Sequence, residues 1–163
     1  MPKQQTIIKP VSLKGVGIHS GNEVNLTFKP AKENFGYAFC RIDLAEKPII
    51  EADINYVVST ERGTTLEKNG VIIQTSEHVL AALVGLEIDN VLIEIDASEP
   101  PILDGSSKFF VEALIKAGIT EQKDDRKEYI VKDIISYYDE KTGSDITIIP
   151  SKFYEVTAMV DFD

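Results

Sequence analysis

Residues 71–96 read VIIQTSEHVLAALVGLEIDNVLIEID and contain a strand, a helix and a second strand in succession. The run that follows Glu77 is apolar and helix-forming, and Gly85 is a typical stop signal. We therefore predict a helix from Glu77 to about Val84. Four of the six residues of Val91–Asp96 are apolar, which indicates a buried strand.

On either side of this stretch, further segments alternate between apolar and polar residues, as strands do. We predict strands over residues 6–13, 23–28 and 37–43, and a hairpin of 64–68 with 71–75. Asn69-Gly70 favours the two-residue turn of such a hairpin. Residues 45–60 follow no regular pattern. The glycine-rich segment Gly15–Gly21 is predicted to be a turn, and it lacks the spacing of a dinucleotide-binding loop.

A second helix is predicted between the loop Glu99–Ser106 and Gly118, which would end it. Apolar residues recur there at helical spacing and form a core face of Phe110, Leu114 and Ala117. Asp104 or Ser106 is placed to cap this helix. The segment Thr120–Lys127 is charged and carries no apolar anchor, so we interpret it as a linker.

Beyond the linker we predict three strands, over residues 128–138, 146–149 and 154–162, with a turn at Lys141–Gly143. No helix is predicted to cover them, and a sheet with one bare apolar face is not a finished domain. We therefore expect the beginning of a second domain. An unfinished sheet edge also favours self-association between copies of the chain.

Charge and cysteine content exclude several classes of protein. There are 27 Asp and Glu residues against 17 Lys and Arg, a net charge of -10, which repels the phosphates of nucleic acid and argues against an RNA-binding module. No window approaches the about 18 apolar residues of a membrane-spanning helix, and no secretory signal opens the chain. The single cysteine, Cys40, is interpreted as a packed small hydrophobe. We expect a cytoplasmic protein.

The pair Glu77-His78 is the feature of the sequence that most clearly indicates a chemical function. A carboxylate beside an imidazole can place a general base next to a metal ligand. A hydroxyl cap from Thr75 or Ser76 would put the pair in the first helical turn, where both side chains can flank one point. The plain alternative is that Glu77 offsets the helix dipole and His78 is a partly buried side chain. The chain has only two histidines, including His19, whereas a zinc site needs about three protein ligands.

Three motifs together resemble one enzyme family. They are the turn Gly15–Gly21, the helix start Ser76–Leu83 with Gly85 and Ile88-Asp89-Asn90 behind it, and the loop Glu99–Ser106. In order and spacing they are similar to those of the UDP-3-O-acyl-N-acetylglucosamine deacetylases. These are zinc amidases that catalyse the committed step of lipid A synthesis, and some members are fused to a 3-hydroxyacyl-acyl-carrier-protein dehydratase.

The resemblance implies an α+β fold. Its core would be a two-layer sandwich of a mixed β-sheet packed on two helices, with a small inserted sheet from about residue 45 to residue 75. Residues 1–119 would form this first domain, residues 120–127 the linker, and residues 128–163 the first strands of a second, similar domain. The active site of the family lies between its two domains.

The resemblance also implies roles for individual residues. His78 would be a zinc ligand and Glu77 the catalytic base. His19 would contact the substrate, UDP-3-O-(3-hydroxyacyl)-N-acetylglucosamine, although a histidine in a glycine loop can also be a plain turn residue. The cleft floor would be lined by Ile18, Thr60, Arg62 and Gly63. Family members often carry an apolar residue at the position of Arg62.

The other ligands of the family, a His and an Asp one helical turn apart, belong to the second domain. So do its catalytic histidine and the hydroxyl that helps hold the oxyanion, and this sequence contains none of them. We therefore expect the chain to be inactive alone and to need the missing second domain. The alternative function is a non-catalytic domain of the same fold that binds a ligand or another protein.

Overall fold

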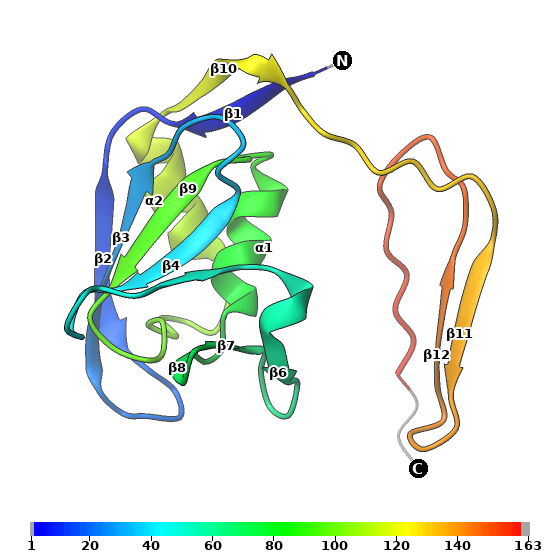
Figure 1. The fold of residues 1–163 in the computed structure, drawn as a ribbon, viewed down its shortest axis with the longest axis horizontal. Helices are drawn as coiled ribbons and strands as arrows, with labels where there is room; N and C mark the ends of the chain where they lie inside the picture. The colour runs from blue at the N-terminus through cyan, green and yellow to red at the C-terminus, as the bar shows by residue number, and fades with distance from the viewer. Residues whose placement is uncertain (1, 161–163) are drawn as a thin grey trace. The chain divides into compact units, whose positions relative to one another are not determined.

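The computed structural model describes residues 2–160. The chain divides into two compact units, with the boundary between Arg126 and Lys127. The first unit contains both helices and most of the strands, and the second contains one hairpin (Figure 1).

A five-stranded sheet forms the centre of the first unit. Its strands, in spatial order, are β2 (Val11–Val16), β3 (Glu23–Pro30), β9 (Val91–Ile95), β4 (Tyr37–Arg41) and β5 (Ile49–Glu51). The sheet is mixed, because β4 and β9 run parallel and the other neighbours are antiparallel. Alternate residues of β3 and β9 are fully buried on one face: Val24, Leu26, Phe28, Val91, Ile93 and Ile95.

The helices α1 (Glu77–Gly85) and α2 (Lys108–Ala117) cover that face. The predicted helical face is confirmed, because Phe110, Leu114 and Ala117 are buried against the sheet. The rings of Phe28 and Phe110 meet edge to face at 6.3 Å. A mixed sheet with two helices on it is the α+β arrangement expected from the sequence. No helix of the described residues is long and apolar enough to cross a membrane.

Two predictions about the ends of this unit were wrong. Residues 6–13 form two strands, since β1 (Lys3–Ile7) ends before Pro10 and β2 begins after it. Most of the predicted linker is the strand β10 (Ile119–Asp125), which pairs antiparallel with β1. Most of the side chains of β10 are polar and exposed, and its sequence shows no apolar alternation. Its backbone hydrogen bonds to β1 hold it in place.

A small sheet is inserted between β5 and α1, as expected. It consists of β6 (Val57–Ser59), β7 (Thr65–Lys68) and β8 (Val71–Ile73). The predicted hairpin turn is confirmed, with φ of 53° at Asn69 and 77° at Gly70. The irregular segment predicted over residues 45–60 was wrong in part. It contains β5, the short helix η1 (Ile54–Tyr56) and β6, which at three residues each are too short to show a period.

The second unit is built on the hairpin of β11 (Ile135–Asp139) and β12 (Ser144–Ile148), with Gly143 in its turn at φ 70°. The predicted turn is confirmed, but the first strand is shorter than predicted. Residues 154–160 form no strand, and residues 161–162 of that prediction lie outside the described residues. The apolar side chains of the hairpin, including Tyr137 and Ile146, are exposed. That this unit begins a second domain stays a prediction.

Candidate active site

The chain enters α1 through a constrained turn. Thr75 has φ of 51°, a left-handed conformation that a β-branched residue rarely adopts. The Ser76 backbone N–H and hydroxyl both donate to the Thr64 carbonyl, at 3.2 and 3.1 Å. The predicted hydroxyl cap was wrong, because neither side chain caps the helix. The Thr75 hydroxyl instead donates to the Glu99 carboxylate at 3.1 Å.

The predicted pair Glu77 and His78 occupies the first turn of α1. One carboxylate oxygen of Glu77 accepts a hydrogen bond from the Thr64 N–H at 2.8 Å. The other lies 3.8 Å from Nε2 of His78. Both side chains are about one-third exposed, at 38% and 31%. The His78 carbonyl accepts a hydrogen bond from the Ser107 hydroxyl at 2.9 Å, which ties this turn to the start of α2. The pair can therefore present a base and a metal ligand to one point.

His19 lies in the glycine-rich turn, where both its ring and its backbone N–H have hydrogen-bonding partners. Its ring nitrogen Nε2 lies 3.2 Å from the Arg62 carbonyl, within hydrogen-bonding distance. Its backbone N–H donates to both carboxylate oxygens of Glu99, at 3.1 and 3.2 Å. At Gly17 a Cβ atom would lie 2.4 Å from that carboxylate, so the close approach requires glycine.

Glu99 is a site residue that sequence reasoning missed. Its side chain is fully buried and accepts hydrogen bonds from the N–H groups of His19 and Ser20 and from the Thr75 hydroxyl. Burial opposes its ionisation, but these hydrogen bonds outweigh burial and lower the pKa of Glu99 below its usual value. The only signal in the sequence was an acidic residue directly before Pro100-Pro101.

A small cavity of about 120 Å³ adjoins this cluster. It is lined by His19, Glu61, Arg62, Gly63, Thr65, Gln74 and Thr75. Three of the predicted substrate-binding residues, His19, Arg62 and Gly63, therefore come together. Ile18 and Thr60 are exposed and are not part of its lining. A Cβ atom at Gly63 would lie 3.3 Å from a carboxylate oxygen of Glu77, so Gly63, which lines the cavity, lies close to the predicted base.

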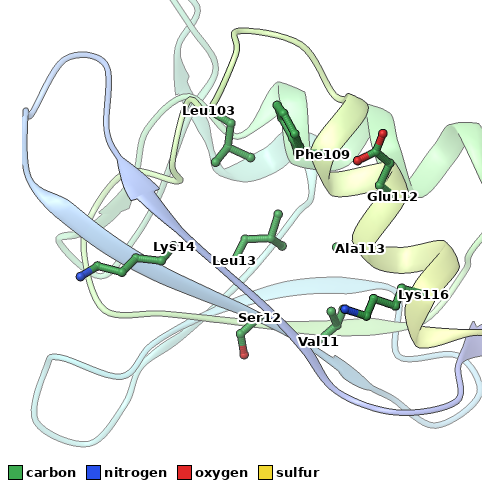
Figure 2. Close-up of a pocket in the computed structure, with 9 residues that line it drawn as sticks. All are labelled: Val11, Ser12, Leu13, Lys14, Leu103, Phe109, Glu112, Ala113 and Lys116. Atoms are coloured by element: carbon green, nitrogen blue, oxygen red, sulfur yellow. The ribbon is translucent and has the colours of Figure 1, made fainter.

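A larger groove of about 470 Å³ lies between β2 and α2 (Figure 2). The side chains of Leu13, Leu103 and Phe109 line its apolar part, and Lys14 points away from it. It contains none of the predicted site residues. Cys40 is buried in β4, and burial raises the pKa of its thiol, as fits a packed small side chain.

The donor set fits one side of a metal site. His78 supplies an imidazole and Glu77 a carboxylate beside it. Residues 2–160 contain no group of three or more His, Cys, Asp or Glu residues that could hold a metal ion. The described residues therefore do not form a complete zinc site, which needs about three protein ligands.

Comparison with known proteins settles the family. A family model described as LpxC: UDP-3-O-acyl N-acetylglycosamine deacetylase matches residues 4–163. The chain belongs to this family. The resemblance drawn from the three motifs is confirmed, and the LpxC match extends over both structural units.

Curated relatives of this LpxC-family chain are longer than it is. The chain is 45% identical over 159 residues to a bifunctional enzyme LpxC/FabZ of Chlorobaculum tepidum, covering 98% of the chain and 34% of that protein. It is 39% identical over 160 residues to the UDP-3-O-acyl-N-acetylglucosamine deacetylase of Myxococcus xanthus, covering 98% and 50%. It is 42% identical over 165 residues to the UDP-3-O-acyl-N-acetylglucosamine deacetylase of Wigglesworthia glossinidia brevipalpis, covering 100% of the chain and 55% of that protein. The chain spans between about a third and about half of their lengths.

Proposed function

We propose that this chain forms one side of a zinc-dependent deacetylase site. The reaction is removal of the N-acetyl group of UDP-3-O-(3-hydroxyacyl)-N-acetylglucosamine, the committed step of lipid A synthesis. Family membership supports the proposal, as do the names of the Myxococcus and Wigglesworthia relatives. The observation that carries it is the placement of Glu77 and His78 in one helical turn, with a carboxylate oxygen 3.8 Å from the ring nitrogen.

Glu77 is the proposed general base. The Thr64 N–H fixes one of its oxygens at 2.8 Å, so the carboxylate is held beside His78 before substrate arrives. A carboxylate positioned in this way can take a proton from the attacking water and return it to the leaving amine. General acid–base catalysis of this kind contributes about 10²–10⁴-fold to the rate.

His78 is the proposed zinc ligand of this chain, through its imidazole. When bound, zinc would polarise the amide carbonyl and lower the pKa of water at the site to about 7. The described residues do not complete the ligand set. In this proposal the remaining ligands come from the part of the deacetylase that this chain does not span.

The cavity beside Gly63 is the proposed contact surface for substrate. The His19 ring and the polar groups of Arg62 line it and can form hydrogen bonds with sugar hydroxyls. Ile18, adjacent to His19 and exposed, offers an apolar contact to the acyl chain. A chain with a single cysteine suits a reducing compartment, and we propose that the enzyme acts in the cytoplasm.

The proposal predicts that Glu77→Gln separates metal binding from turnover in the full-length deacetylase. The neutral amide cannot accept the proton, so kcat should fall by at least about 100-fold. Zinc content, measured by mass spectrometry after dialysis, should remain at the wild-type level because His78 is unchanged. Glu112→Gln on the exposed side of α2 is the matched control and should leave both values unchanged. Near-normal turnover by Glu77→Gln would remove the base assignment.

A second candidate function is that of a non-catalytic binding domain, because the described residues do not form a complete metal site. A domain of this fold that only binds a ligand or a protein needs no zinc. Zinc content of the full-length protein separates the two functions: about one tightly held ion per chain supports the deacetylase, and none supports the binding domain.

A further inference from the structure

The buried carboxylate of Glu99 takes no part in the chemistry proposed above. It has zero exposure, yet no Lys or Arg side chain of residues 2–160 forms an ion pair with it. Burying a carboxylate costs free energy unless hydrogen bonds compensate it. Among the described residues, the compensating hydrogen bonds come from two chain segments, His19-Ser20 and the Thr75 hydroxyl.

The two carboxylate oxygens of Glu99 accept hydrogen bonds from different sets of donors. Oε1 accepts from the His19 N–H at 3.1 Å and from the Thr75 hydroxyl at 3.1 Å, so it joins the glycine-rich turn to the entrance of α1. Oε2 accepts from the Ser20 N–H at 2.8 Å and from the His19 N–H at 3.2 Å. The carboxylate therefore bridges two segments that are more than 50 residues apart in the sequence.

Two chains of contacts lead from Glu99 to the proposed base. One runs through Thr75 to Ser76, whose N–H and hydroxyl donate to the Thr64 carbonyl. The Thr64 N–H in turn donates to Glu77. The other runs through the His19 ring to the Arg62 carbonyl, two residues before Thr64 in the sequence. Glu99 thus closes a ring of contacts that contains both the substrate-side histidine and the base.

Backbone strain in this ring of contacts is a second, independent indication that Glu99 holds the two segments in place. Thr75 and Arg62 have φ of 51° and 59°, conformations that non-glycine residues rarely adopt. Such conformations persist only where the surrounding structure over-determines them, and they cluster at functional sites. The close approach of Gly17 to the same carboxylate shows that the turn is folded around Glu99.

We propose that Glu99 is a positioning residue, which fixes His19 and the first turn of α1 relative to each other. Its catalytic consequence depends on the function proposed above, whereas its structural consequence does not. An amide cannot replace the carboxylate, because a glutamine would turn an NH₂ group toward an N–H donor. An NH₂ group in place of Oε2 would face the Ser20 N–H, and an NH₂ group in place of Oε1 would face the His19 N–H.

The first test measures the positions of the two segments in this chain. With two histidines, a His78→Gln variant assigns the His19 ring signals in a proton–carbon correlation spectrum. In Glu99→Gln we expect the His19 ring signal and the Glu77 and Thr64 amide signals to shift or broaden. Amide signals of the central strand β9 should remain. Unchanged His19 and Glu77 signals in folded Glu99→Gln would overturn the proposal.

A milder pair of variants decides the matter if Glu99→Gln fails to fold. Thr75→Val removes the hydroxyl bond to Glu99 and keeps the side-chain shape, and Thr75→Ser keeps the bond. We expect Thr75→Val to shift the Glu77 and His19 signals and Thr75→Ser to resemble wild type. Equal spectra of the two variants at these residues would contradict the bridge through Glu99.

The second test uses the full-length deacetylase. Thr75→Val should lower kcat by about 10-fold or more, with zinc content unchanged and partial rescue in Thr75→Ser, the size of effect known for residues that orient ligands. A wild-type protein without deacetylase activity would remove the proposed function, while the spectra would still test the positioning role. Normal kcat in Thr75→Val, with active wild type, would remove the catalytic consequence.

Discussion

Adjacent residues of an α-helix point about 100° apart, so Glu77 and His78 would diverge in the middle of a helix. In the first turn, Glu77 bends toward the Thr64 N–H and keeps its second oxygen 3.8 Å from the His78 ring. Gly63 makes room for this bend, because a Cβ atom there would lie 3.3 Å from the carboxylate. The chemistry proposed for the pair thus depends on a glycine of another segment.

The placement of some of these site residues could be predicted from the sequence, and that of others could not, for a physical reason. Glu77 and His78 stand next to each other, and the polar residues before them indicate a helix start, so their placement followed from local pattern. The role of Glu99 depends on donors that lie 79 and 80 residues away in the sequence, at Ser20 and His19. No local pattern contains that information.

Tyr37 should make the stability of the first unit fall at alkaline pH. Burial, with the Asp89 carboxylate adding to it, raises the pKa of Tyr37 to about 12, and its hydroxyl donates to the Ile88 carbonyl. In the unfolded chain the phenol has a pKa of about 10. Between these two values the unfolded state releases a proton that the folded state retains, so the free energy of unfolding falls as pH rises.

Urea unfolding at pH 8, 10 and 11 checks this expectation. Tyr37→Phe should lose part of the decline above pH 10, because phenylalanine does not titrate. Tyr138→Phe, at an exposed position, should follow the wild-type curve. An identical pH dependence in Tyr37→Phe and wild type would show that the phenol does not contribute.

Polar contacts between elements stabilise the parts of the fold that bury few apolar side chains. The pair β1–β10 contributes little to the apolar core beyond Ile7 and Ile119, and a buried Asn90 side chain connects it to the central sheet. The Asn90 amide donates to Gln4 and Gln122, at 2.8 Å each, and accepts from the Gly36 N–H at 2.9 Å. The helices and the longer strands could be predicted because burial imposes a period on their sequences. β10 could not, because most of its side chains are polar and exposed and its hydrogen-bonding partners lie far away in the sequence.

Asn90→Ala should therefore destabilise the first unit strongly. The change leaves the Gly36 N–H without its acceptor and removes the Asn90 donor from the side-chain oxygens of Gln4 and Gln122, and we expect a loss of about 2–4 kcal/mol in the free energy of unfolding. Urea denaturation of the chain measures it. Asn55→Ala, at an exposed position of the short helix η1, is the control and should change stability by less than about 0.5 kcal/mol. Equal midpoints for the two variants would mean that β1–β10 does not need this amide.

The two units differ in how much apolar surface each of them buries. The first encloses a continuous core between sheet and helices. In the second, Ile135, Tyr137 and Ile146 are at least half exposed, as a hairpin without a covering layer must leave them. The sequence pattern predicted this hairpin and its turn. Self-association through its strands stays a prediction, because nothing in a single chain tests it.

The incomplete metal site gives the last prediction, which concerns zinc binding by this chain. One imidazole and a neighbouring carboxylate are fewer than the about three protein ligands that hold zinc tightly, and residues 2–160 offer no larger group. After dialysis against buffer without metal, the chain should retain far less than one zinc per molecule by mass spectrometry. His78→Gln should lower any weak binding seen by calorimetry, whereas Glu112→Gln should not. One tightly held ion per chain that disappears in His78→Gln would show that this chain completes the site itself, and the division of ligands proposed here would be wrong.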